Sequence, residues 1–240
     1  MIIHDIKLSY LKISDILKLI STCISNNEKK VITYFNVNTF NILSTNKSSI
    51  NDFKEFDLVH PDGLGILLAS KILFGKDGFS TKITGSDLYV ELITYSINNN
   101  YSFFFFGDSE ETLEQISSTN PSLNVKGYHN GFNYENTNLI GKINEAAPDI
   151  LLVGLGSPKQ EEWIVQNRFM INPKVIIAVG DGIKVFAGTK KRGPKIFQKL
   201  GLEWIVRIFF EPKRLWKRYI IGIPLFTFRI IKFKFSLKNP

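Results

Sequence analysis

Residues 148–163, PDILLVGLGSPKQEEW, constrain the fold of this chain more than any other stretch. The uninterrupted apolar run 150–153 predicts a β-strand buried on both faces, which is typical of a parallel sheet. The glycines and the proline of 154–158 end that strand sharply, and residues 159–168 favour a helix. This order directs backbone N–H groups and a helix N-terminus towards an anion. The alternative is an ordinary strand–helix turn without a ligand.

Short apolar runs followed by polar turns and helical segments recur along the chain. The other runs are 31–35, 56–59, 101–106, 124–128 and 175–179. Together they predict five or six strands alternating with helices, the pattern of a doubly wound, mostly parallel, Rossmann-like α/β sheet. Ligands of such sheets bind at the carboxyl ends of the strands. The residues expected to converge there are Asn36, Asp62, Gly107, Gln160 and Gly180.

Asp62 is the most notable carboxylate of the chain, because it lies in a turn just after the predicted strand 56–59. A carboxylate at the mouth of a cleft can act as a general base, and a helix N-terminus keeps it ionised. The alternative is that Asp62 only caps the helix predicted over 64–73. Asn36 also has two interpretations, as a hydrogen-bonding partner of a ligand or as a helix cap.

The net charge of +8 is concentrated in the C-terminal part of the chain. Residues 195–240 contain eleven Lys and Arg against only Glu203 and Glu211. Their longest uncharged run, 219–228, has ten residues, whereas a membrane span needs about 20. We expect a catalytic α/β domain over 1–194 and a basic, aromatic-rich helical appendage over 195–240 on an anionic membrane surface. The alternatives are a nucleic-acid arm, which the apolar character disfavours, and a packed helical hairpin with an incidental basic face.

Several kinds of chemistry have no motif in this sequence. It contains no Asp-x-Asp, no paired Cys/His metal spacing, no G-x-S-x-G and no Walker A motif. We therefore expect no bound metal and no cofactor. Cys23 is the only cysteine, which excludes an internal disulfide and suits a reducing compartment. The N-terminus lacks the pattern of a signal peptide, so we expect a cytoplasmic protein.

Four motifs resemble those of the WecG/TagA/CpsF glycosyltransferases: HPDG, ITGSDL, VGLGSPKQEEW and KRGPKIFQKLGLEWIVRIFFEPKRLWKRY. The likeness extends from about residue 31 to 219. It implies an inverting, metal-independent enzyme that transfers a sugar from UDP-N-acetylmannosamine or another UDP-hexose to a polyprenyl-diphosphate-linked sugar. It also implies cell-surface polysaccharide or teichoic acid synthesis by a peripheral protein on the inner face of the plasma membrane. The alternative is a catalytically altered UDP-sugar-binding or scaffold protein at the membrane, and self-association into a homo-oligomer stays open.

The resemblance also assigns site residues. Asp62 matches the general base that takes a proton from the acceptor hydroxyl, and Gln160 matches a pocket residue that touches sugar or phosphate. The cations of the appendage are expected to close over the site and to stabilise the leaving diphosphate. The residues expected to bind substrate are Asn36, Asn38, Lys82, Gly107, Asp108, Gly131, Gly156, Lys159, Glu161, Gly180, Arg192, Arg207, Arg214 and Arg218.

Five positions depart from the pattern of this family. Tyr34 stands where Thr is frequent, and Lys82 stands where Arg is usual, which exchanges a fork-like phosphate contact for a point charge. Gly193 replaces the alanine of an Arg-Ala-Pro motif. Asp181 and Lys184 stand where a small apolar residue and an aspartate are frequent. These departures bear on the identity of the donor sugar more than on the chemistry.

Overall fold

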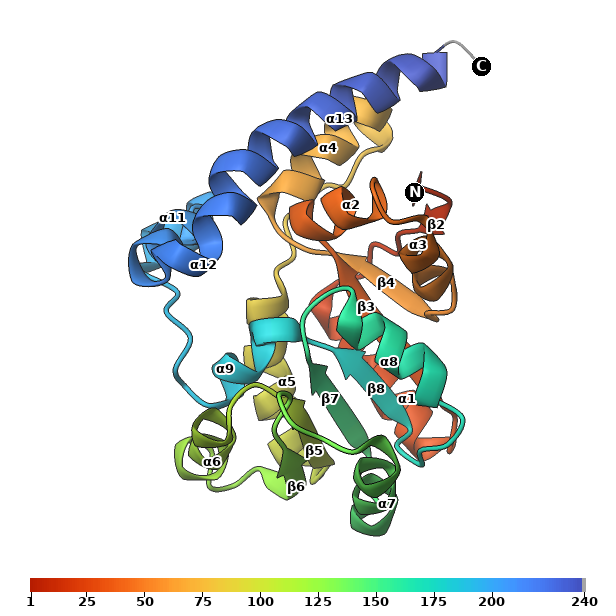
Figure 1. Cartoon of the computed structure of the whole chain (residues 1–240), viewed down its shortest axis with the longest axis vertical. Helices are drawn as coiled ribbons and strands as arrows, with labels where there is room; N and C mark the ends of the chain where they lie inside the picture. The colour runs from red at the N-terminus through yellow and green to blue at the C-terminus, as the bar shows by residue number, and fades with distance from the viewer. Residues whose placement is uncertain (239–240) are drawn as a thin grey trace.

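A single parallel sheet forms the centre of the protein in the computed structural model, which describes residues 1–238 (Figure 1). The strand order is β4-β3-β8-β7-β5-β6, and every neighbouring pair is parallel. The strands are β3 (Lys30–Phe35), β4 (Leu58–Pro61), β5 (Ser102–Gly107), β6 (Asn124–His129), β7 (Ile150–Gly154) and β8 (Val175–Ala178). A small antiparallel hairpin of β1 (Ile2–Ile3) and β2 (Ile6–Lys7) precedes them. The predicted Rossmann-like α/β fold is confirmed.

Helices cover both faces of the sheet. The hydrophobic cluster on one face includes residues of α1 (Ile13–Ser25), α5 (Gly85–Asn99), α6 (Glu110–Thr119) and α9 (Ile183–Phe186). The cluster on the other face includes residues of α2 (Val37–Leu43), α3 (Lys47–Lys54), α4 (Leu64–Phe74), α7 (Asn136–Ala146), α8 (Lys159–Asn167) and α13 (Gly222–Lys238).

The apolar strands divide their side chains between these two clusters, as strands buried on both faces require. In β5, Phe103 and Phe105 belong to the first cluster, whereas Phe104 and Phe106 belong to the second. None of the four is more than 3% exposed. Each buried ring stabilises the sheet by about 1.5–3 kcal/mol relative to an exposed position. The run 150–153 divides in the same way, so its predicted burial on both faces is confirmed.

The strand that leads to Asp62 begins two residues later than the sequence predicts, since β4 covers Leu58–Pro61 rather than 56–59. The Asp57 carboxylate accepts a hydrogen bond from the Val31 backbone N–H at 2.8 Å, and Phe56 packs in the core. Pro61 lies inside the strand because β4 is at the edge of the sheet, where a missing N–H leaves no ladder bond unpaired.

The C-terminal part leaves the sheet after α9 and returns to the carboxyl edge of its strands (Figure 1). It consists of α10 (Lys195–Leu200), α11 (Glu203–Phe210), α12 (Pro212–Trp216), a π-helical turn (Lys217–Ile221) and α13. α13 packs beside α2 and α4, where Phe226 and Ile230 join the core and Arg229 donates two hydrogen bonds of 3.0 Å to Asn41. The predicted helical appendage is therefore present; the domain boundary at 194/195 stays a prediction.

Candidate active site

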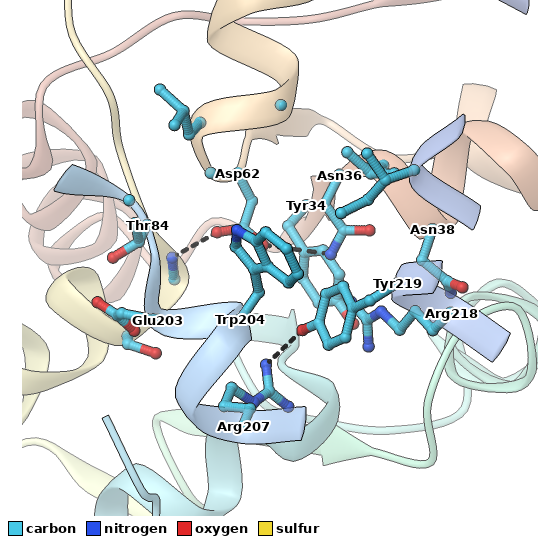
Figure 2. Close-up of a pocket in the computed structure, with 18 of the residues that line it drawn as sticks. Tyr34, Asn36, Asn38, Asp62, Thr84, Glu203, Trp204, Arg207, Arg218 and Tyr219 are labelled. Carbon is cyan, nitrogen blue, oxygen red and sulfur yellow. Dashed lines mark hydrogen bonds between the residues drawn. The ribbon is translucent and has the colours of Figure 1, made fainter. Parts of the chain in front are cut away.

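A pocket of about 680 Å³ lies where the carboxyl ends of four strands meet the C-terminal helices (Figure 2). Its wall combines residues that are far apart in the sequence. The ends of β3, β4, β7 and β8 contribute Tyr34, Asn36, Asp62, Gly156 and Gly180, and the C-terminal helices contribute Trp204, Arg207, Arg214, Arg218 and Tyr219. This is the edge of the sheet at which doubly wound folds bind ligands.

The Asp62 carboxylate is held by one hydrogen bond on each oxygen (Figure 2). Its Oδ1 accepts the backbone N–H of Gly85, the first residue of α5, at 2.9 Å. Its Oδ2 accepts the Asn36 side-chain amide at 3.2 Å. Each oxygen keeps a lone pair for a ligand hydroxyl.

The two capping interpretations have different outcomes. Gly63 is the N-cap of α4, and the helix has no side-chain cap, so the alternative that Asp62 only caps the following helix is wrong. The positive φ of Gly63, 87°, turns the chain so that Asp62 reaches α5 instead. Asn36 does cap α2, because its Oδ1 accepts the Thr39 backbone N–H at 3.1 Å. Its amide nitrogen simultaneously holds Asp62, so capping and a place in the pocket coexist in one side chain.

Gln160 lies beneath the pocket and is fully buried. Its Oε1 accepts the backbone N–H groups of Gly156 at 3.1 Å and Gly180 at 2.9 Å. Its Nε2 donates to Glu161 Oε1 at 2.9 Å and to Tyr34 Oη at 3.3 Å. One side chain thus joins the turns after β7 and β8, both of which line the pocket. A direct contact between Gln160 and the sugar or phosphate stays a prediction.

Glu161 is also fully buried, and it supports the same turn from below. Its Oε1 accepts hydrogen bonds from Thr33 at 2.8 Å, from Ser157 at 3.0 Å and from Gln160. Its Oε2 has no partner among the residues that the structure describes. Burial raises the pKa of Glu161, and the three donated hydrogen bonds only partly offset this effect. Glu161 therefore shapes the pocket floor through its neighbours.

Asp181 is surrounded by Lys190 and by the arginines that the resemblance assigns to the leaving diphosphate. Its carboxylate pairs with Arg207, with Lys190 at 3.1 Å and with Arg214 at 3.8 Å. Burial alone would raise the pKa of Asp181, but the charges of Lys190, Arg207 and Arg218 outweigh it and lower the pKa well below its usual value. This contact fastens α11 to the end of β8, and it was not predicted as a site contact.

The other arginines of the C-terminal part are held differently. Arg218 lines the pocket and forms no ion pair within residues 1–238. Arg192 lies outside the pocket wall and joins Asp87 of α5 to Glu203 of α11. Over the same described range, no three His, Cys, Asp or Glu side chains gather into a group that could hold a metal ion.

The remaining predicted site residues divide into two groups. Asn38 and Lys82 line the pocket, and the Lys82 ammonium donates to the Gln198 carbonyl of α10. Four others lie outside the pocket wall: Gly107, Asp108, Gly131 and Lys159. Gly107 packs directly against the Gly154 backbone, Gly131 donates its N–H to the Asp108 carbonyl at 3.1 Å, and Lys159 is exposed. The structure therefore brings together about half of the predicted set.

Sequence reasoning missed several residues of the pocket wall, notably Thr84, Glu203, Trp204 and Tyr219 (Figure 2). A signal for Trp204 was available, because it lies three residues before Arg207 and so shares a helix face with it. Tyr219 accepts a hydrogen bond of 3.4 Å from Arg207, and its ring packs against Trp204 at a tilt of 39°, with 5.7 Å between the ring centroids. These aromatic rings form the wall that faces the sheet.

The parallel sheet and the charged pocket at its carboxyl edge define a Rossmann-like enzyme whose site is completed by C-terminal helices. Residues 1–240 match the family described as "Glycosyl transferase WecG/TagA/CpsF family", so the chain belongs to this family and is a glycosyltransferase.

Two Staphylococcus aureus proteins are among its relatives, and both are named N-acetylglucosaminyldiphosphoundecaprenol N-acetyl-beta-D-mannosaminyltransferase. The protein of strain MRSA252 is 31% identical over 219 residues, which are 90% of this chain and 84% of the relative. The protein of strain NCTC 8325 / PS 47 is 30% identical with the same coverage.

Proposed function

We propose that this glycosyltransferase moves a sugar from a UDP-sugar to a polyprenyl-diphosphate-linked sugar with inversion at the anomeric carbon. The donor is UDP-N-acetylmannosamine or another UDP-hexose, and the product serves cell-surface polysaccharide or teichoic acid synthesis. The names of the two staphylococcal relatives support the N-acetylmannosaminyl group and the undecaprenyl acceptor. The observation that carries the proposal is that Asp62 shares one pocket with Arg207, Arg214 and Arg218.

Asp62 is the general base of this reaction. Its carboxylate accepts the proton of the acceptor hydroxyl while that oxygen forms a bond to the anomeric carbon of the donor. The bond from that carbon to the UDP oxygen breaks, and UDP leaves with the electron pair. Attack and departure on opposite sides of the carbon produce inversion. The hydrogen bonds from Gly85 and Asn36 hold the carboxylate at a fixed angle, which a base for one hydroxyl requires.

The negative charge that develops on the leaving diphosphate faces the cations of the pocket wall. Arg218 is free of ion pairs within the described chain, whereas Arg207 and Arg214 are paired with Asp181. Lys82 and Lys190 add two further cations to the pocket wall, and Lys190 is paired with Asp181. Fixed charges in a partly enclosed site stabilise such an oxyanion more strongly than water does. Gln160 contributes by fixing the turns at Gly156 and Gly180.

The C-terminal part places the enzyme on an anionic membrane surface at the inner face of the plasma membrane. No helix within residues 1–238 is both long and apolar enough for a transmembrane span. Large apolar side chains are instead exposed along the C-terminal helices, at Phe209, Phe210, Trp216, Ile220, Ile221, Leu225, Phe228, Ile231 and Phe235. Lysines at 213, 217 and 232 are exposed among them. Apolar side chains with interspersed cations favour the boundary of an anionic bilayer.

The test is the Asp62→Asn variant, assayed for transfer from a panel of UDP-sugars to an undecaprenyl-diphosphate-linked acceptor. We expect kcat to fall by a factor of about 10² to 10⁴, because the amide cannot accept the proton. UDP binding, measured by calorimetry, is retained. The matched control is Asp57→Asn, because Asp57 also accepts a backbone N–H but lies at the amino end of β4. Full activity in Asp62→Asn would show that another group is the base.

A further inference from the structure

The pocket has two ends of different chemistry. One end contains Asp62, Asn36 and the cations that face the leaving diphosphate of the donor. The other end lies between α4 and α13 and is lined by Leu64, Leu68, Ile72, Ile223, Thr227 and Ile230. We call this second end the apolar arm. The transfer reaction described above uses only the polar end, so the arm needs a separate explanation.

The arm follows one face of each helix. Leu64, Leu68 and Ile72 are spaced four residues apart on α4, so they lie above one another over about 12 Å at 1.5 Å per residue. Ile223 and Ile230 are seven residues apart on α13, which is two turns. The two helices pack side by side and run away from the sheet in the same direction (Figure 1).

The side chains of α4 in the arm are open to solvent although they are apolar. Leu68 is 51% exposed and Ile72 is 41% exposed, whereas Ile66 and Ala69 of the same helix are buried in the core. Scattered exposed apolar residues need no explanation, but a continuous apolar wall that extends a catalytic pocket is typical of a ligand site. Gly65 lets α4 pack closely against α2 at the bottom of the arm, because a Cβ atom at this position would lie 2.3 Å from Val37 Cγ2.

The order of chemical groups along the arm decides what it can hold. α4 begins two residues after Asp62, so the carboxylate lies at the mouth of the arm. On the other wall, Arg218 comes first and is followed by Ile223 and Ile230. A ligand that matches both walls has a hydroxyl at one end, an anion in the middle and a hydrocarbon chain at the other end. The outward face of α13 continues the apolar surface with exposed Leu225 and Phe228.

We infer that the apolar arm binds the isoprenoid units of the acceptor that are nearest to its diphosphate. This inference rests on the proposed function, since it assigns a binding site to the lipid part of the proposed acceptor. The acceptor sugar then reaches Asp62, and the chain runs between Leu68 and Ile223 towards the bilayer. Arg218, whose guanidinium has five N–H donors, then lies between the acceptor's own diphosphate and the leaving diphosphate of the donor. A lipid-linked acceptor is thereby selected by its chain as well as by its sugar.

The experiment compares two acceptors that carry the same sugar diphosphate, one linked to an undecaprenyl chain and one linked to a butyl group. Both are assayed in detergent micelles with saturating UDP-sugar. The measured quantity is the ratio of kcat/KM for the undecaprenyl acceptor to that for the butyl acceptor. In Leu68→Gln this ratio falls about tenfold, the effect of losing one buried leucine contact with the chain. Leu68→Met, which restores an apolar side chain, recovers most of the ratio.

The matched control is Val90→Gln on α5, because Val90 is 46% exposed and lies outside the pocket wall. It keeps the wild-type ratio. Glutamine and leucine have similar helix propensity, and circular dichroism verifies that α4 remains folded. An unchanged ratio in Leu68→Gln overturns the inference, as does equal use of both acceptors by the wild-type enzyme. If the wild-type enzyme uses neither acceptor with any UDP-sugar, the proposed function itself fails.

Discussion

Replacing Asp181 by asparagine tests how the C-terminal helices are fastened over the pocket. The substitution keeps the shape of the side chain but removes the charge that Lys190, Arg207 and Arg214 share. Lys190 precedes α10, and Arg207 lies in the middle of α11. We therefore expect the change to loosen the docking of residues 190–214 rather than to unfold the sheet.

The magnitude follows from the burial of the groups involved. The side chains of Asp181, Arg207 and Lys190 are 23%, 13% and 11% exposed. The burial of this ion-paired group is intermediate between two cases. Exposed ion pairs contribute about 0.2–1 kcal/mol, and disruption of buried pairs costs about 3–5 kcal/mol. Arg214 is 50% exposed and 3.8 Å away, so its share is small. We expect a loss of about 2 kcal/mol, between these limits.

Amide hydrogen exchange of α11 is the assay, because it reports local opening. A loss of about 2 kcal/mol accelerates exchange about 30-fold at pH 7, since each 1.4 kcal/mol is a factor of ten. The pKa of Asp181 is lowered in the folded protein. Its contribution to stability is therefore complete above the unfolded pKa of about 3.9 and is lost as the pH falls through the lower folded pKa. The difference between wild type and variant shrinks only in that acidic window.

Asp5→Asn is the control for this experiment. The Asp5 side chain is 84% exposed and lies 3.7 Å from Lys54, so we expect its removal to change stability by less than about 0.5 kcal/mol. Both residues receive the same chemical change, and only their surroundings differ. If α11 in Asp181→Asn exchanges within threefold of the wild-type rate, the contact does not hold the helix and the reasoning is refuted.

Two further predictions concern Glu161, beneath the pocket, and Gly107, at the end of β5. Glu161→Gln keeps a carbonyl acceptor for the three donors Thr33, Ser157 and Gln160. Glu161→Ala leaves these donors unpaired, and we expect it to lower the free energy of unfolding by about 3 kcal/mol, measured by urea denaturation. Burial raises the pKa of Glu161, so the wild-type free energy of unfolding falls as the pH rises above the unfolded pKa of about 4.3. In Glu161→Gln this dependence of the free energy of unfolding on pH is weaker. An equally steep dependence in the variant would contradict the reasoning. Gly107→Ala places a Cβ atom 2.5 Å from the Gly154 backbone at a φ of 133°, and we expect a loss of about 3 kcal/mol or more. Both Gly107→Ala and its control are measured by thermal unfolding. The control is Gly141→Ala on α7, where a Cβ meets nothing within 4 Å, and it should be neutral or stabilising.

The sheet was predictable because its signal is local. The runs 101–106 and 150–153 have no polar residue at their centre, and such strands occur only where both faces are covered. The start of β4 was displaced because Asp57 finds a partner in β3, which no local pattern records. Asn36 and Asp62 were found because both follow strands, and parallel strands bring their carboxyl ends to one edge.

The contacts that finish the site were beyond local patterns. Asp62 is held by Gly85, which is 23 residues away, and Asp181 is paired with Arg207, 26 residues away in another helix. The motif around Gln160 indicated a ligand, and the structure shows in addition that its amide joins the turns after β7 and β8. All of these contacts depend on which distant residues meet in space, and a local sequence pattern does not record that. Sequence reasoning therefore located the edge of the site and only part of its wall.

Because the pocket joins the ends of β3 and β4 to helices formed by residues after 200, its assembly follows the order of translation. A polypeptide of residues 1–194 contains every strand of the sheet but none of the aromatic wall that includes Trp204 and Tyr219. N-terminal segments are synthesised first, so Asp62 and its partners Asn36 and Gly85 exist before the cover does. A prematurely terminated polypeptide of that length consequently lacks both the cover of the pocket and its arginines Arg207, Arg214 and Arg218.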